Sequence, residues 1–448
     1  MADVSGKFTH GSVSRHILVM TSTSALSLLA VFLVDILTLV YVAMLHDPLL
    51  LAAVGIAKVL IFANGAIAGG LIIAAASVLS ARIGKRAGAG FARLTFSLIL
   101  MTLLISAATA AVQLALISPV THWLGADASL YPVARSFIWL TLPFAVLQST
   151  MQMCAQILRT TGDSRRAMWV VLSGAATLAV ADPLLIFVFH LGLEGAGIAY
   201  AVSAIVSTWL GIYWVRRQTG LRFSADIRLL RQHVQVTFKI ALPAIIGNLA
   251  TPVGLAYLFS VLATYGASML AAMAVVDRVM QFSYCAFFAL PSALAPVLGQ
   301  NIGADRQPRV AAAIVFTRRL VVAYGLAVWA LLIVSGGLIA DLYELQGEGR
   351  ALFLVFCQVG AGLWAIIGLD FVAMSVFVTM GRPWLVAMFA WLRATVGTLP
   401  FVYLGTRLFG GSAALAGMFT GNALIAIISI FTASLTAKRF FANRTGPA

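Results

Sequence analysis

The sequence predicts an all-α integral membrane protein with twelve transmembrane helices in two six-helix lobes. Of its 448 residues, 62% are hydrophobic and only 10% are charged, whereas about a quarter of the residues of a soluble protein carry a charge. Twelve apolar stretches are each long enough to cross a bilayer, which takes about 20 helical residues. The two halves of the chain also share short motifs at one constant spacing. Composition, span length and repetition therefore all predict the same fold class.

Each apolar stretch is interpreted as one helix. The first stretch follows Lys7 and Arg15 as in a signal peptide, but it runs too far for one, so we expect a retained helix. Two prolines each in the seventh and eighth stretches predict kinked or unwound helices there. In chain order the stretches cover residues 16–45, 50–80, 91–118, 131–158, 167–190, 192–215, 234–263, 267–298, 310–338, 351–379, 384–407 and 412–436.

The charges predict the orientation of these helices. The chain carries 29 Lys and Arg against 14 Asp and Glu, a net charge of +15. If the N-terminus is cytoplasmic, most of the bases fall in inner segments, and the outer segments receive only Arg135, Arg350 and Arg407. Because inner loops are enriched in Lys and Arg, we expect both termini in the cytoplasm of a bacterium, with the chain in the inner membrane. This distribution explains the basic surplus without a nucleic-acid partner.

The repeat predicts the lobe boundaries. Leu51-Ala52-Ala53 matches Leu270-Ala271-Ala272, and Gly162 matches Gly381 at the same spacing, as do Ile83-Gly84 and Ile302-Gly303. Six helices per repeat give both lobes the same orientation, as in secondary transporters built from parallel repeats. We expect an N-terminal lobe at 1–215, a cytoplasmic linker at 216–239 and a C-terminal lobe at 240–448.

Ionisable residues inside the helices are the candidates for function, because a charge in the hydrocarbon costs several kcal/mol. Asp35 and Asp182 are expected at similar depth in the N-terminal lobe, where two desolvated carboxyl groups could exchange protons. The alternative is that either one pairs with Lys58. Seven residues stand inside the predicted helices: Asp35, Lys58, Asp182, Asp277, Arg278, Asp370 and Arg393.

The C-terminal lobe holds the remaining four. Asp370 and Arg393 are expected at equal depth on successive helices, which favours a structural ion pair, with a cation-binding role for Asp370 as the alternative. Asp277 and Arg278 are neighbours and point about 100° apart, so we expect packing partners for them, with substrate contact as the alternative. Lys58, Asp277, Arg278, Asp370 and Arg393 are thus further candidates for contact with substrate or coupling ion.

Other classes of function find little support in the sequence. The cysteines Cys154, Cys285 and Cys357 lie far apart in apolar runs and have no metal-ligand spacing. No P-loop motif and no nucleophile-and-base motif occurs, so neither ATP hydrolysis nor enzymatic catalysis is expected. We expect no cofactor and no bound metal beyond a coupling ion, H⁺ or Na⁺.

Several loop motifs resemble the MATE (multidrug and toxic compound extrusion) family, in its DNA-damage-inducible-like branch. They are Gly299-Gln300-Asn301-Ile302-Gly303-Ala304, Leu158-Arg159-Thr160-Thr161-Gly162-Asp163, Gly192 to Ala199, and Met380-Gly381-Arg382-Pro383. The resemblance implies two lobes forming a V and antiport of H⁺ or Na⁺ against small organic, often cationic, compounds. It also implies coupling roles for Asp35 and Asp182, and for Asp370 in some members.

The sequence departs from that branch at two oxygen-bearing positions. Leu178 stands where the branch often has Asn, and Tyr200 stands where it often has Thr. Because a hard cation needs several oxygen ligands, these changes favour H⁺ over Na⁺ as the coupling ion. We therefore expect a monomeric H⁺-coupled efflux transporter. The alternatives are a lipid or lipid-linked oligosaccharide flippase of the same superfamily and, from another class, a lipid-modifying membrane enzyme.

Overall fold

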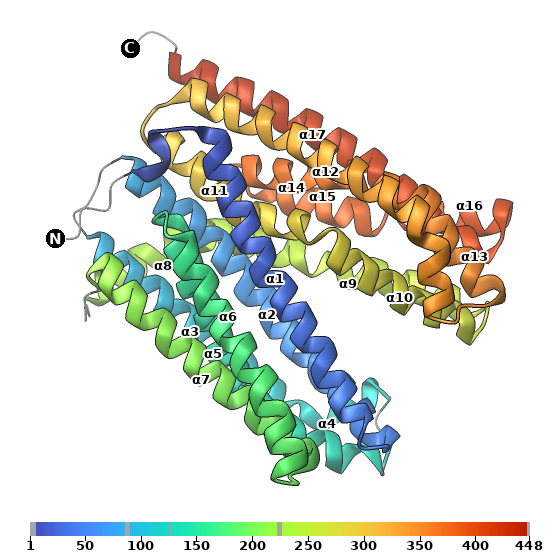
Figure 1. Cartoon of the computed structure of the whole chain (residues 1–448). Helices are drawn as coiled ribbons and strands as arrows, with labels where there is room; N and C mark the ends of the chain where they lie inside the picture. Colours follow the sequence, from blue (N-terminus) through green and yellow to red (C-terminus); the bar gives the residue numbers. More distant parts are fainter. Residues whose placement is uncertain (1–5, 86–89, 126, 222–225, 446–448) are drawn as a thin grey trace. The chain divides into compact units, whose positions relative to one another are not determined.

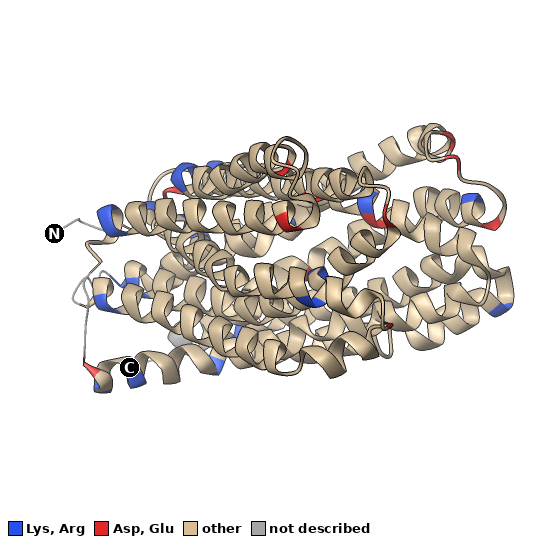
Figure 2. Cartoon of the chain, turned by 90° about the horizontal axis from the view of Figure 1, so that it is seen from below, with Lys and Arg blue, Asp and Glu red and all other residues tan. Residues whose placement is uncertain are grey.

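A computed structural model describes residues 6–85, 90–125, 127–221 and 226–445. Every regular element in these ranges is a helix, and twelve helical stretches among them are long and apolar enough to cross a membrane (Figure 1). The ribbons carry neither Lys, Arg, Asp nor Glu over most of their length (Figure 2). Helices suit this composition because each satisfies its own backbone hydrogen bonds, which lipid cannot do. The predicted fold class is confirmed.

The first half of the chain forms long helices joined by short turns. Helix α5 packs against α2, α3, α6 and α7. Asp47 caps α2 by accepting from the Leu49 amide at 2.9 Å, and Asp163 caps α6 by accepting from the Arg166 amide at 3.1 Å. The elements are α1 (Val13–Ala43), α2 (Pro48–Gly84), α3 (Phe91–Ala115), α4 (Ile117–Trp123), α5 (Leu130–Thr160), α6 (Ser164–Pro183), the π-helix η2 (Leu184–Val188), α7 (Gly192–Thr219) and α8 (Ile227–Asn248).

The second half is more interrupted. Helix α14 packs against α11, α12 and α17, and α17 also packs against α16. The elements are α9 (Ala250–Ala263), α10 (Ala267–Ser283), α11 (Cys285–Gly303), α12 (Gln307–Leu342), α13 (Gly347–Val355), the π-helix η3 (Phe356–Gly360), α14 (Ala361–Thr379), α15 (Trp384–Ala394), α16 (Leu399–Phe409), the 3₁₀ turn η4 (Gly411–Ala413) and α17 (Ala414–Thr445), with the 3₁₀ turn η1 (Lys7–Thr9) ahead of α1.

Breaks divide several of the predicted helices. The seventh is split at Leu249, between Pro243 and Pro252, and the eighth is split at Tyr284, ahead of Pro291. The eleventh is unwound before Pro400, whose ring cannot continue a preceding helix without strain. The fifth and tenth contain η2 and η3, whose wider turns are typical of functional sites. Interrupted helices of this kind line the binding sites of many transporters.

The chain folds into two compact units. Unit 1 comprises Met1–Lys7 and Thr23–Ala241, and unit 2 comprises Phe8–Ser22 and Leu242–Ala448. The predicted lobes placed residues 8–22 with the first half, whereas in the structure these residues belong to unit 2. Helix α8 begins inside the segment 216–239, and residues 222–225 of that segment lie outside the described ranges.

The repeat is visible in two equivalent turns. After α5, the Asp163 amide donates to the Leu158 carbonyl at 2.9 Å, and after α14, the Arg382 amide donates to the Phe377 carbonyl at 2.8 Å. In each turn a glycine takes a positive φ, 91° at Gly162 and 76° at Gly381, which a side chain would disfavour. The two units therefore reverse the chain by the same device at matching positions of the repeat.

Candidate functional site

Unit 1 brings together three of the predicted ionisable residues. The Lys58 ammonium of α2 lies 3.5 Å from Oδ1 of Asp35 on α1, and it also donates to the Asp35 carbonyl oxygen at 3.4 Å. Both side chains remain open to their surroundings, with 35% of Lys58 and 49% of Asp35 exposed. The pairing of Asp35 with Lys58 is the alternative that the sequence left open. It leaves Asp182 without a lysine partner.

Asp182 occupies a different environment on α6. Its side chain is fully buried, and its Oδ2 accepts a short hydrogen bond from the Thr38 hydroxyl of α1. Its Oδ1 has no hydrogen-bond partner among the described residues. Thr38 lies one turn after Asp35 on α1, a spacing that places the two side chains on the same helix face. The Asp35 side chain and the contact between Thr38 and Asp182 therefore lie on the same face of α1.

The backbone around Asp182 is shaped by the residues that follow it. Pro183 ends α6, and η2 follows, in which the Phe189 amide bonds back to the Leu184 carbonyl. Helix α7 packs directly on this segment at Gly195, where an added Cβ would lie 2.7 Å from the carbonyl carbon and oxygen of Leu185. The motif from Gly192 to Ala199 thus packs closely against η2, the segment that follows Asp182 and Pro183.

Two polar residues of unit 1, Thr38 and Asn64, were not singled out from the sequence, whereas Tyr200 was named there only as a departure from the family pattern. Thr38 binds Asp182 directly. Asn64 of α2 is buried, donates to the Ser106 carbonyl at 3.0 Å and accepts from Ser149. The hydroxyl of Tyr200 on α7 is buried and has no hydrogen-bond partner among the described residues. The helical spacing between Asp35 and Thr38 is the one signal that could have identified a member of this group.

Unit 2 pairs Asp370 of α14 with Arg393 of α15. Nη1 of Arg393 lies 2.5 Å from Oδ2 of Asp370, and the two side chains are 18% and 1% exposed. Directly after Arg393 the helix unwinds, and the Thr398 hydroxyl donates to the Arg393 carbonyl at 2.7 Å. The two residues that the sequence placed at equal depth are therefore brought together beside a break in the helix.

Asp277 and Arg278 of α10 both form hydrogen bonds with Gln281. The amide nitrogen of Gln281 donates to Asp277 at 2.7 Å, and the amide oxygen of Gln281 accepts from Arg278 at 3.2 Å. Each contact joins residues three or four apart on one helix. In the structure both residues are thus held by their own helix.

The residues of the motif Gly299–Ala304 hold the N-terminal segment of unit 2. Gln300 accepts from the Phe8 amide at 3.0 Å, and Asn301 donates to the Phe8 carbonyl at 3.1 Å. Arg309 donates to Asn301 and to the carbonyl oxygens of Phe8, His10 and Gly11. Gln300 and Asn301 are fully buried. In this chain the motif therefore anchors Phe8, and Arg309 extends the anchoring to His10 and Gly11.

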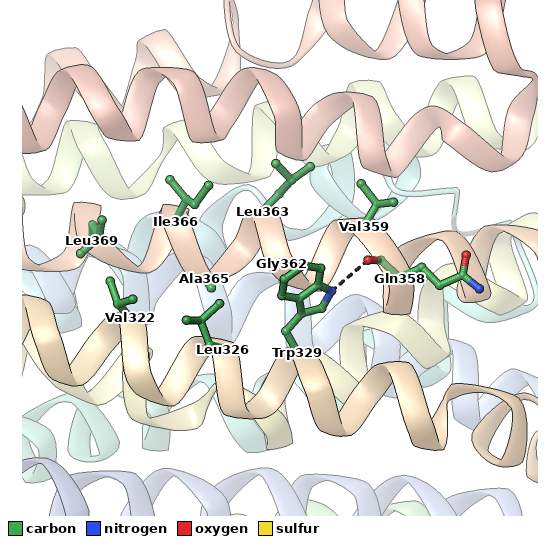
Figure 3. A pocket seen from close by; sticks show the side chains of 10 residues that line it. All are labelled: Val322, Leu326, Trp329, Gln358, Val359, Gly362, Leu363, Ala365, Ile366 and Leu369. Atoms are coloured by element: carbon green, nitrogen blue, oxygen red, sulfur yellow. Dashed lines mark hydrogen bonds between the residues drawn. The ribbon is translucent and has the colours of Figure 1, made fainter.

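An apolar groove of about 370 Å³ lies between α12 and α14 in unit 2 (Figure 3). Its lining includes Val322, Leu326 and Trp329, and the Trp329 indole donates to the Gln358 carbonyl at 2.9 Å. That carbonyl belongs to η3, which exposes it by shifting the helical hydrogen bonds. None of the seven ionisable residues predicted from the sequence lines this groove, so it is separate from the charged sites.

The sequence matches the MatE family over residues 24–184 and 243–404, which is more than half of the chain. The chain belongs to this family. Members of the MatE family and the similar solved structures are transporters, so this multi-pass membrane protein is a transporter and not an enzyme. The predicted family is thereby confirmed, whereas its DNA-damage-inducible-like branch stays a prediction.

Curated relatives of this MatE chain include three bacterial proteins. It is 37% identical over 242 residues to the uncharacterized 21 kDa protein in the iaaL 5' region of Pseudomonas savastanoi, covering 52% of this chain and 78% of that one. It is 24% identical to the FAD transporter of Shewanella oneidensis, covering 79% and 81%. It is 23% identical to the multidrug export protein MepA of Staphylococcus haemolyticus, covering 65% and 64%.

Solved structures share its fold. The crystal structure of a point mutant of the Vibrio cholerae MATE transporter VcmN is 21% identical, with a TM-score of 0.89 over 97% of both chains. A MOP superfamily transporter from Pyrococcus furiosus is 19% identical, with a TM-score of 0.89 over 98% of this chain and 99% of that one. At these identities the likeness establishes the fold, which is two six-helix lobes. The substrate and the coupling ion have to be inferred from the residues of the site.

Proposed function

We propose that the chain exports small organic compounds across the bacterial inner membrane in exchange for protons, with both termini in the cytoplasm, and that it acts as a monomer. The observation that carries the proposal is the buried carboxyl group of Asp182, which accepts one hydrogen bond from Thr38 and keeps Oδ1 without a partner. An ionised carboxyl group can only accept hydrogen bonds, whereas a protonated one also donates. Proton uptake would therefore change the hydrogen bonding between α6 and α1.

The pairing of Lys58 with Asp35 favours H⁺ over Na⁺ as the coupling ion. A sodium ion at Asp35 would have to displace or repel the ammonium group that already lies 3.5 Å from its carboxylate. Leu178 offers no oxygen ligand where the branch often has Asn, and Tyr200 places a phenol where the branch often has the smaller hydroxyl of Thr. A proton needs no such ligand set. Protonation from outside would lower the affinity of unit 1 for substrate, and substrate from inside would favour proton release.

The test is transport by the purified chain in proteoliposomes, with ethidium as a fluorescent organic cation and with an imposed pH or Na⁺ gradient. We expect efflux driven by the pH gradient alone. Asp182→Asn and Thr38→Val should reduce it to the level of empty vesicles, whereas Thr38→Ser should retain it. Asp341→Asn is the control, because it alters an exposed acid that pairs with Arg350. Flux that follows only the Na⁺ gradient, or full activity of Asp182→Asn, would refute proton coupling at this site.

A second substrate class is favoured by one relative. Similarity to the FAD transporter of Shewanella oneidensis extends over 79% of this chain, more than the 65% shared with the multidrug export protein. FAD carries negative charge, and Lys58 is the cation of the N-terminal site that could attract it. The same vesicles loaded with FAD distinguish the two: pH-driven FAD efflux without ethidium efflux would assign the transporter to flavin nucleotides.

A further inference from the structure

A second cavity, of about 340 Å³, lies in unit 2 at the ends of α14, α15 and α17. Arg382, in the turn between α14 and α15, lines one side, and Arg439, near the C-terminal end of α17, lines another. The apolar side chains of Leu435 and Phe440 also line it. Its volume falls within the range of roughly 300–1,000 Å³ that is usual for small-molecule sites. The cavity thus combines a basic rim with an apolar wall.

The positive charge of this cavity is not neutralised by the protein. None of the residues lining it is acidic, and none of the ion pairs within the described ranges involves Arg382 or Arg439. The lining hydroxyls of Thr432 and Thr436 donate to carbonyl oxygens of their own helix. The guanidinium groups are therefore the donors left for a ligand, and their planar fork matches a phosphate group.

The depth of the cavity follows from the length of α17. This helix has 32 residues, about 48 Å at 1.5 Å per residue, whereas the hydrocarbon core is about 30 Å thick and holds about 20 residues. Counted from Ala414, the helix leaves the hydrocarbon close to Thr432. Arg439 then lies about 10 Å further along the axis, at the level of the lipid headgroups.

One face of α17 connects this basic end to the hydrocarbon. Leu424, Ile428, Phe431 and Leu435 follow one another at intervals of three or four residues, and they are 48%, 54%, 65% and 40% exposed. That spacing forms a single stripe along the helix, and the next position on the stripe is Arg439. An apolar stripe that runs directly into an arginine matches a molecule with a hydrocarbon tail and an anionic head.

We propose that this cavity binds the phosphate group of an anionic phospholipid, with an acyl chain lying on the apolar stripe of α17. Basic pockets between transmembrane helices on the cytoplasmic side are suited to phosphate-bearing headgroups. A zwitterionic lipid fits less well, because its quaternary ammonium group would meet the two arginines. The proposal concerns a site in unit 2 that holds none of the residues assigned to proton coupling, and it does not depend on which substrate is transported.

The test is lipid binding to the purified full chain in detergent, measured by native mass spectrometry. Phosphatidylglycerol and phosphatidylcholine with identical acyl chains are titrated in parallel. The wild-type chain should bind phosphatidylglycerol more tightly. Because one basic residue near the membrane surface contributes about 1 kcal/mol, Arg382→Gln and Arg439→Gln should each weaken this binding about fivefold, and the double variant about 25-fold. Binding of phosphatidylcholine should not change.

Lys438→Gln is the matched control, since it removes one positive charge next to Arg439 without touching the cavity lining. Equal losses in Lys438→Gln and Arg439→Gln would mean diffuse attraction and would overturn the proposal. So would unchanged lipid preference in the double variant, or displacement of phosphatidylglycerol by equimolar inorganic phosphate. The wild-type measurement stands without any variant: a chain with no preference for the anionic lipid lacks this site. Circular dichroism in lipid-free detergent establishes that the variants fold.

Discussion

The ion pairs Asp35–Lys58 and Asp370–Arg393, which lie within the membrane-spanning helices of this transporter, differ in their access to the surroundings. Asp35 and Lys58 are 49% and 35% exposed, so either partner can exchange with water or ligand. Asp370 and Arg393 are 1% and 18% exposed, so neither can leave the other without stranding a charge. The first arrangement suits a site that changes partners during a cycle. The second suits a fixed contact that closes α14 onto α15 at the point where the helix unwinds.

Asp370→Asn should therefore act mainly on stability. Removing one partner of a buried ion pair typically costs about 3–5 kcal/mol, because the other charge is left uncompensated. Replacing both partners with apolar groups of similar size, as in Asp370→Leu with Arg393→Met, should recover most of the loss. Thermal unfolding in detergent measures both effects. A stable Asp370→Asn variant that no longer transports would instead assign the carboxylate to ion coupling.

Residues of this kind could be found from the sequence because charge stands out in an apolar helix. Asp35, Lys58, Asp182, Asp370 and Arg393 were singled out by that reasoning, and the structure places each within reach of a polar partner. Thr38 was not singled out, since a hydroxyl in a helix can always bond to its own backbone, and only its spacing from Asp35 pointed to it. Which acid Lys58 would pair with also depends on helix rotation, which composition does not fix.

At the level of helices, apolar length predicts the spans but not their internal breaks. Twelve spans follow from hydrophobicity, and prolines pointed to the interruptions in the seventh and eighth. The π-helices η2 and η3 were not predicted, because one inserted residue shifts the hydrogen bonds without changing an apolar pattern. A glycine of α7 packs against η2. Gly195 leaves room for the carbonyl of Leu185, which a larger residue would not.

Gly195→Ala should disturb that contact. The added methyl group would approach the Leu185 backbone to 2.7 Å, so η2 must move away from α7 and carry Asp182 with it. Overpacking of this kind typically costs about 1–3 kcal/mol, and proton-driven transport should fall together with stability. Gly337→Ala is the control, because no heavy atom lies within 4 Å of the added group. Equal melting temperatures for the two variants would contradict the tight packing of α7 on η2.

For the whole chain, orientation in the membrane is the property that the positive charges predict. Arg217, in the last turn of α7, belongs to the expected cytoplasmic side, and Glu348, at the start of α13, belongs to the expected outer side. Both side chains are exposed, whereas Cys154, Cys285 and Cys357 are buried and should react slowly with thiol reagents.

A membrane-impermeant maleimide tests this orientation. In intact spheroplasts it should label Glu348→Cys and spare Arg217→Cys, and inverted vesicles should reverse the result. The unmodified chain, with its three buried thiols, is the control for background labelling. Labelling of Arg217→Cys from outside would mean that the charge distribution does not set the orientation of this chain.

The anchoring of residues 8–11 also bears on the order in which the protein is made. Phe8 leaves the ribosome before Gln300, which accepts a hydrogen bond from the Phe8 amide and follows 292 residues later in the chain. The segment must therefore wait without its partners while all of unit 1 is synthesised. Its docking under Arg309 is then a late event that requires α11 and the start of α12. Protection of residues 6–16 from proteolysis would therefore appear only once unit 2 has assembled.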